Sequence, residues 1–132
     1  MASQTAQFSF ELFPPRTPEG VAKLPNIAAQ LAAVQPKYFS VTYGAGGSDQ
    51  DGTYDTVVKV VERTGIEAAP HLTCVGSSRA RIASLLDRYK AAGVRRIVAL
   101  RGDLPATAMG TGAPGDFHYA NELVSFIRDT HG

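Results

Sequence analysis

The chain has 132 residues, 44% of them hydrophobic, and its 13 basic and 12 acidic side chains leave a net charge of +1. This length predicts a single domain over residues 1–132, and the balanced charge gives no electrostatic case for nucleic acid or a membrane as a partner. One cysteine excludes an internal disulfide, and the N-terminal segment lacks the charged and apolar regions of a signal peptide, so we expect a cytoplasmic protein.

The first predicted element is a strand over residues 8–13, which Pro14 and Pro15 end. Hydrophobic residues alternate along it with Ser9 and Glu11, which is typical of a mostly buried strand. Burial of Glu11 would raise its pKa and let it donate a proton near neutral pH. The alternative is a structural role for Glu11, in an ion pair with Arg16 or in contact with water.

A helix follows, with Thr17 as its cap, and its apolar residues keep helical spacing as far as Val34. Pro25 lies inside this pattern and is expected to kink the helix or to restart it. The next strand, residues 38–43, leads into a glycine-rich loop, residues 44–48. This loop matches neither the dinucleotide fingerprint nor the P-loop motif, so we expect a tight turn that brings the backbone close to a ligand.

The second half of the chain repeats the alternation of helix and strand. A helix capped by Asp51 or Thr53 and ended by Gly65 precedes a strand over residues 66–74, in which Pro70 predicts a bulge or a break. The elements predicted after it are a helix that begins at Ser77 or Ser78 and ends at Gly93, a strand over residues 94–100, an irregular loop over residues 104–116, and a helix with apolar residues from Tyr119 to Ile127. Cys74 is expected to be a small buried side chain rather than a nucleophile.

Four successive strand–helix pairs predict parallel strands in an α/β fold, either an open sheet or part of a β/α barrel. Polar residues mark the carboxyl end of each strand, which is the ligand-binding edge in both architectures. We therefore predict one shared site, formed by Glu11, Thr42, Tyr43, His71, Thr73, Arg101 and Asp103.

Four segments resemble the methylenetetrahydrofolate reductase family, namely Phe8-Ser-Phe-Glu-Leu-Phe-Pro-Pro-Arg-Thr17, Ser40-Val-Thr-Tyr-Gly-Ala45, Ala69-Pro-His-Leu-Thr-Cys74 and Ala99-Leu-Arg-Gly-Asp-Leu-Pro105. The resemblance implies a TIM-type β/α barrel that binds FAD and reduces 5,10-methylenetetrahydrofolate to 5-methyltetrahydrofolate with NADH or NADPH. It implies that Glu11 is the general acid and that Asp103 lies near the flavin and the folate; both would be catalytic and bind substrate. The FAD contacts that it implies are Thr42, Tyr43, Ala45, His71, Arg101, Gly102, Asp103, Tyr119 and Ala120, and it implies no metal.

Two features depart from the family pattern. Residues 49–53 lack the basic side chain expected beside Thr53, and a β/α barrel usually takes about 250 residues, so the chain supplies four of eight units. A half barrel is expected to be incomplete for catalysis and to self-associate through its open edges. The alternatives are a non-catalytic module that pairs with itself or with a complementary chain, and another folate- or flavin-using barrel.

Overall fold

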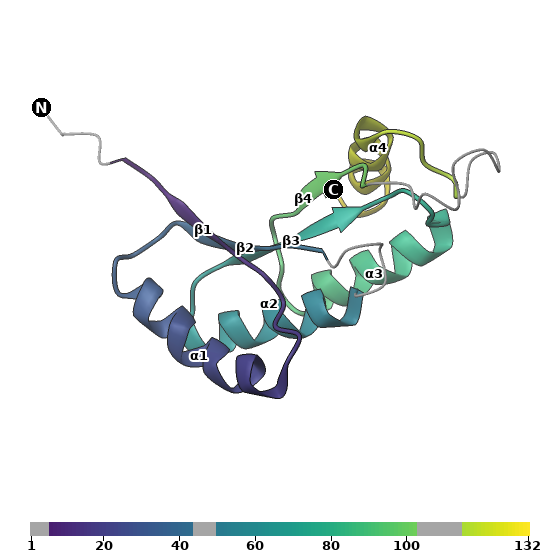
Figure 1. The fold of residues 1–132 in the computed structure, drawn as a ribbon. Coiled ribbons are helices and arrows are strands. Elements are labelled where there is room, and N and C mark those ends of the chain that lie inside the picture. The colour runs from purple at the N-terminus through teal and green to yellow at the C-terminus, as the bar shows by residue number, and fades with distance from the viewer. Residues whose placement is uncertain (1–5, 44–49, 103–114) are drawn as a thin grey trace, which may run out of the picture.

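The computed structural model describes residues 6–43, 50–102 and 115–132, which form four alternating strands and helices (Figure 1). The strands are β1 (Ser9–Leu12), β2 (Tyr38–Val41), β3 (Ala68–Thr73) and β4 (Val98–Leu100). The helices are α1 (Pro18–Ala32), α2 (Gln50–Thr64), α3 (Arg79–Ala91) and α4 (Ala120–His131). The predicted order of elements is confirmed.

The four strands form one sheet in the order β1-β2-β3-β4, and every neighbouring pair is parallel. A doubly wound sheet reverses its strand order at a switch point, whereas a β/α barrel keeps neighbouring strands in chain order. The observed order therefore distinguishes between the two predicted architectures. The described chain has the arrangement of four successive units of a β/α barrel.

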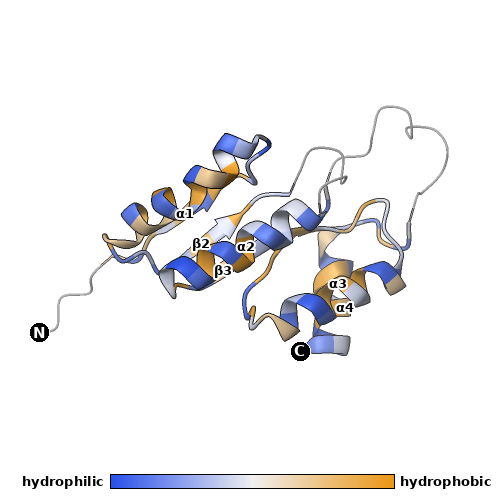
Figure 2. Ribbon diagram, turned by 90° about the horizontal axis from the view of Figure 1, so that it is seen from below, coloured by the Kyte–Doolittle hydropathy of each residue, from blue (hydrophilic) through white to orange (hydrophobic). Residues whose placement is uncertain are grey.

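The core lies between the sheet and the helices that cover one of its faces (Figures 1 and 2). Phe39, Val41 and Leu72 point to this face and are fully buried, as parallel strands under helices require. The buried face of α3 consists of Ile82, Leu85, Leu86 and Tyr89, which recur at helical spacing. Cys74 is also buried, which confirms its predicted packing role.

Several helix ends follow the predicted local chemistry. The hydroxyl groups of Thr17 and Ser78 accept hydrogen bonds from backbone N–H groups in the first turns of α1 and α3. Gly65 and Gly93, which follow α2 and α3, have φ angles of 69° and 86°, in the left-handed region. These four residues fix where the helices begin and end.

One of the two alternatives for Pro25 is excluded, and two other local predictions were wrong. Helix α1 does not restart at Pro25, which lies within one continuous helix. Asp51 and Thr53 do not cap α2, because the helix begins at Gln50 and includes both. Strand β3 also continues through Pro70: residues up to Pro70 pair with β2 and residues from His71 pair with β4, so the missing N–H falls where the pairing partner changes.

The first strand is shorter and more exposed than predicted. Of β1 only Leu12 is buried, while Phe8 and Phe13, on either side of it, are 44% and 73% exposed. The reason is that β1 is an edge strand, which pairs with β2 alone among the described residues. The fourth strand is likewise restricted to Val98–Leu100, and the preceding residues from Val94 do not pair.

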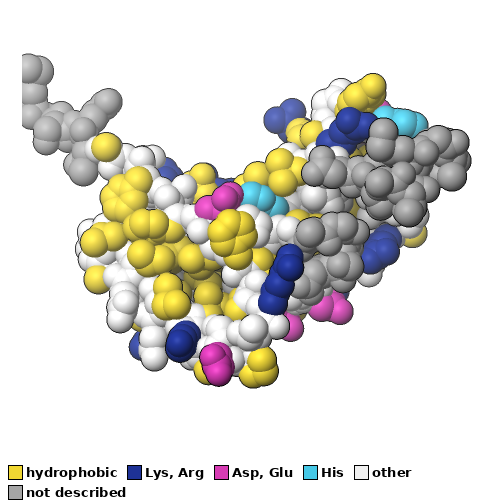
Figure 3. Space-filling model, viewed as in Figure 1, with side chains coloured by type: hydrophobic (Ala, Val, Ile, Leu, Met, Phe, Trp, Pro, Cys, Tyr) yellow, Lys and Arg dark blue, Asp and Glu magenta, His cyan; other side chains and the backbone are white. Residues whose placement is uncertain are grey.

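Exposed hydrophobic side chains gather over β1 and α1 (Figure 3). Helix α1 buries only Leu24 and Ala28, because it contacts α2 on one side and has no helix beside it on the other in the described chain. We call the exposed members of this group the β1–α1 patch; they are Phe8, Phe13, Val21, Ile27 and Val34.

Candidate functional site

Glu11 and His71 form the centre of the candidate site. Nε2 of His71, on β3, lies 3.3 Å from Oε1 of Glu11, on β1. Figure 3 shows acidic and histidine side chains side by side in a hollow in the upper part of the molecule. The predicted meeting of these two residues is thus observed, although their strands are not neighbours in the sheet.

The strand register explains how the two side chains meet across β2. Glu11 pairs with Ser40, and Ser40 pairs with Ala69, so these residues share the sheet face that the helices leave uncovered. His71 is two residues beyond Ala69 and therefore points to the same face. Because Ser40 is small, it leaves room for the two longer side chains to bridge above it, and it is itself only 8% exposed.

The two partners differ in their exposure to solvent. The side chain of His71 is 12% exposed and that of Glu11 is 54% exposed. Burial lowers the pKa of His71, and the Glu11 carboxylate opposes this by raising it. The imidazole is therefore mainly neutral at neutral pH.

The prediction that Glu11 is buried is wrong, because its side chain is more than half exposed. Its position on an edge strand accounts for the difference, since no strand covers it on the other side within the described residues. The suggested ion pair with Arg16 is not observed either. The ionisable partner of Glu11 in the described structure is His71.

The predicted strand over residues 38–43 ends two residues earlier, at Val41, so Thr42 and Tyr43 directly follow β2 at the predicted carboxyl edge of the sheet. The backbone carbonyl of Thr42 accepts a hydrogen bond of 2.9 Å from the hydroxyl of Thr53, which is fully buried in α2. This bond fixes the end of β2 against the first turn of α2. Thr53 is therefore a structural residue within α2 and not its cap.

Arg101 and Gly102 follow β4 at the same edge. The Arg101 guanidinium lies 5.6 Å from the centre of the Tyr119 ring, and both side chains are exposed. Gly102 has a φ angle of 84°, and a Cβ atom there would lie 2.9 Å from side-chain atoms of Thr73 and Val75. Only glycine allows this close approach of the β4 end to the β3 end.

The backbone around Cys74 joins β3 to the residues after β4 and before α4. The Cys74 thiol lies 3.8 Å from the carbonyl oxygens of Arg101 and Tyr119, and the Val75 N–H donates to the Arg101 carbonyl at 2.9 Å. Burial raises the pKa of this thiol, which disfavours the nucleophilic thiolate. These contacts hold Arg101 and Tyr119 beside the carboxyl end of β3.

The structure thus brings the predicted residues together as two contacting pairs, Glu11 with His71 and Arg101 with Tyr119. Ala120 is the first residue of α4 and directly follows Tyr119. Ala45 and Asp103, which were also predicted to belong to the site, lie outside the described residues.

An ion pair that was not predicted from the sequence lies farther down the uncovered face. Nε of Arg96 lies 3.7 Å from Oε1 of Glu67, and the Arg96 guanidinium lies 4.3 Å from the centre of the Tyr38 ring. Alternation could have found this cluster, because Glu67 is two residues before Ala69 and so shares the face of His71. The pair is too long for a hydrogen bond.

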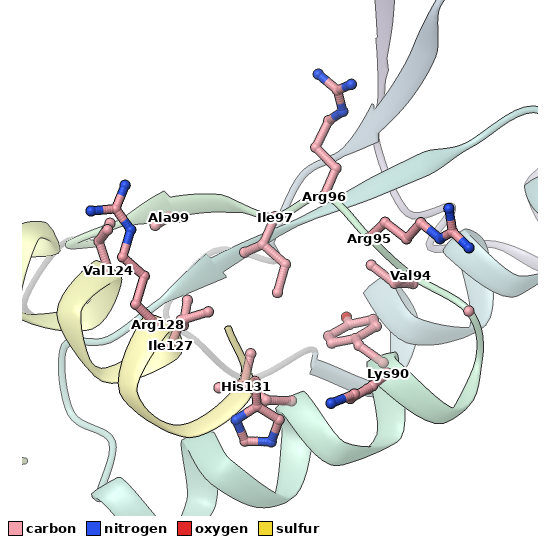
Figure 4. Close-up of a pocket in the computed structure, with 13 residues that line it drawn as sticks. Lys90, Val94, Arg95, Arg96, Ile97, Ala99, Val124, Ile127, Arg128 and His131 are labelled. Carbon is pink, nitrogen blue, oxygen red and sulfur yellow. The ribbon is translucent and has the colours of Figure 1, made fainter.

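A hollow in the described structure is separate from the predicted site. It has a volume of about 840 Å³ and lies between α3, β4 and α4, with an apolar floor and several basic side chains around it (Figure 4). None of the predicted site residues lines it. Within the described residues there is no cluster of metal-binding side chains and no helix long and apolar enough to cross a membrane.

The fold and the site define a class: a parallel β/α protein of the barrel type, with an acid and a histidine on the sheet face opposite the helices. The sequence profile of the family described as Methylenetetrahydrofolate reductase matches residues 1–132. The chain belongs to this family.

Three relatives show the extent of the similarity. The chain is 45% identical to the 5,10-methylenetetrahydrofolate reductase of Salmonella typhimurium and 43% identical to that of Escherichia coli, in each case over 92% of this chain and 39% of the relative. It is 36% identical to Methylenetetrahydrofolate reductase (NADH) 1 of Zea mays, over 95% of this chain and 21% of the relative. The chain therefore spans about two fifths of the length of its bacterial relatives.

Proposed function

We propose that this chain provides the Glu11 half of a site that reduces 5,10-methylenetetrahydrofolate to 5-methyltetrahydrofolate, with FAD as cofactor and NADH as reductant. Membership of the family supports the reaction, and the name of the maize relative supports NADH. The observation that carries the proposal is the contact of 3.3 Å between Glu11 and His71 on the uncovered sheet face.

In this proposal Glu11 acts as general acid. Its exposed carboxyl group can approach a ligand from the open side of the sheet, and it would protonate the folate nitrogen that departs when the five-membered ring opens. The resulting iminium carbon is electrophilic and can accept a hydride. Asp103 is proposed to orient the folate near the flavin.

The residues after β2 and β4 fit an anionic cofactor with a flat ring system. Arg101 is exposed, and no described carboxylate pairs with it, so its planar guanidinium is available for a pyrophosphate. Thr42, Tyr43, Ala45, His71, Gly102, Asp103, Tyr119 and Ala120 are the other proposed FAD contacts. Bound FAD would supply the hydride chemistry that these side chains lack.

Retention of flavin tests the cofactor part of this proposal. The purified chain is mixed with FAD and desalted, and its visible spectrum is recorded. We expect the unmodified chain and the Arg95→Ala variant to retain FAD. Arg95 is a matched control, because it is an arginine at the other end of the segment that contains β4. Arg101→Ala is expected to weaken binding about 10- to 100-fold, since a hydrogen-bonded charge is lost. Equal retention by all three would contradict the assignment of Arg101.

The role of Glu11 is tested by two assays of one variant. Glu11→Gln should reduce the rate of folate reduction by about 100-fold or more. It should leave NADH oxidation with a quinone acceptor unchanged, because that reaction needs no folate protonation. We expect the unmodified chain to be a weak catalyst unless the remaining barrel units of a relative are added. Equal losses in both assays would exclude a specific role for Glu11 as the acid.

A second candidate is a non-catalytic half-barrel module that assembles with another copy of itself. The exposed β1–α1 patch favours it, because soluble monomers rarely expose large contiguous apolar surfaces. This candidate predicts a stable dimer without reductase activity, even after FAD has been added.

A further inference from the structure

We propose that His71 is the positioning residue of Glu11 and that the two side chains take up and release their last proton as one unit. The inference rests on the proposed function, in which Glu11 is the acid. It gives the exposed carboxyl group a source for its proton that does not depend on its own burial.

Geometry makes the pair directional. The imidazole is the inner partner, 12% exposed, and the carboxyl group is the outer one, 54% exposed. One carboxyl oxygen faces Nε2 of His71, while the other has no hydrogen-bond partner among the residues that the structure describes. The pair therefore has a protected end at β3 and an open end at β1, where a ligand would receive the proton.

Within the described residues, the charged group that acts on the proton affinity of His71 is the Glu11 carboxylate, which raises the pKa of the imidazole. From the neighbouring strands, Ser40 and Val98 face it at this level, while Glu67 and Arg96 lie farther down the sheet and pair with each other. On the opposite face, α2 contributes buried, uncharged side chains.

The proton balance is simple. The pair gains one proton from solvent, bound to Nε2 of His71 and shared with the facing carboxylate. On delivery the Nε2–H bond breaks as an O–H bond forms on Glu11, and that O–H bond breaks as an N–H bond forms on the ligand. A neutral imidazole, with its proton on Nδ1, and an ionised carboxylate remain. Nδ1 has no partner among the described residues and can contact a cofactor.

The test is a pH titration of the 132-residue chain by NMR, with the His71 ring nitrogens and the Glu11 carboxyl carbon as probes. We expect both probes to report a transition over the same pH range. Glu11→Gln should move the His71 midpoint to lower pH, because the carboxylate that raises its pKa is gone. Glu11→Asp, which keeps the charge on a shorter side chain, should give a smaller shift in the same direction.

Glu67→Gln is the control, since it removes a carboxylate from the same sheet face without touching the pair, and it should leave the His71 midpoint unchanged. Independent titration of the two probes, or an unchanged His71 midpoint in Glu11→Gln, would overturn the inference. Neither readout requires bound flavin or turnover. Coupled titration in a chain that retains no flavin would therefore support the pair while contradicting the proposed function.

Discussion

At the scale of single residues, Gly102 fixes the geometry of the candidate cofactor edge. We predict that Gly102→Ala lowers the free energy of unfolding more than Gly65→Ala does. Both positions have left-handed φ angles, which cost alanine roughly 1–2 kcal/mol. Only at Gly102 would the new methyl group press on Thr73 and Val75, which adds about 1–3 kcal/mol. Urea denaturation measures both losses, and equal losses would contradict the close approach.

His71 should also make stability depend on pH. Its pKa is lowered in the folded chain, so the unfolded chain binds the proton more tightly. Once the pH falls below the ordinary value of 6.5, protonation therefore favours the unfolded chain. Stability from this source is therefore present above that pH and is lost as the pH falls.

We predict that His71→Gln reduces the difference in unfolding free energy between about pH 7.5 and about pH 5. Comparison of the two pH values within each variant cancels the packing change that glutamine introduces. Denaturation curves with the same pH dependence in both chains would show that His71 carries no linked proton.

At the scale of elements, helix α1 contains a proline, Pro25, at an interior position that disfavours helix formation. An interior proline lacks the N–H that would donate to the carbonyl of Val21, and it costs a helix about 3 kcal/mol relative to alanine. Proline also restricts the unfolded chain, and this effect offsets part of the cost by favouring the folded state. We therefore predict that Pro25→Ala stabilises the protein by about 2 kcal/mol.

Asn26→Ala, at the adjacent exposed position, is the control for helix propensity alone and should gain at most about 0.7 kcal/mol. Thermal and urea denaturation would measure both changes. A loss of stability in Pro25→Ala would mean that packing of the proline ring outweighs the missing hydrogen bond.

These elements also show what the sequence could predict. Local chemistry located the start of α1 at Thr17 and the end of α3 at Gly93, because capping and left-handed turns depend on neighbouring residues. It failed at Pro70, since the change of pairing partner along β3 depends on strands distant in the sequence. It also failed for the burial of Glu11, because alternation cannot tell whether a strand lies at the edge of the sheet.

At the scale of the whole molecule, the two outer strands determine how the chain can associate. Among the described residues β1 pairs only with β2 and β4 only with β3, so each has one unpaired backbone edge. All four strands are parallel, and a twofold axis could set β1 of one copy beside β4 of the other. Eight strands would then close a barrel and remove both edges.

We predict a dimer in sedimentation experiments, with amide hydrogens of β1 and β4 protected from exchange. Ile27→Asp, in the β1–α1 patch, should weaken association about 10- to 100-fold for each copy, since burial of this side chain is lost. Asn26→Asp adds the same charge at an exposed position on another face of α1, outside the patch, and should leave the dimer intact. A monomeric chain with rapidly exchanging β1 amides would contradict closure by a second copy, and open-ended polymers would show that the edges pair without the twofold axis.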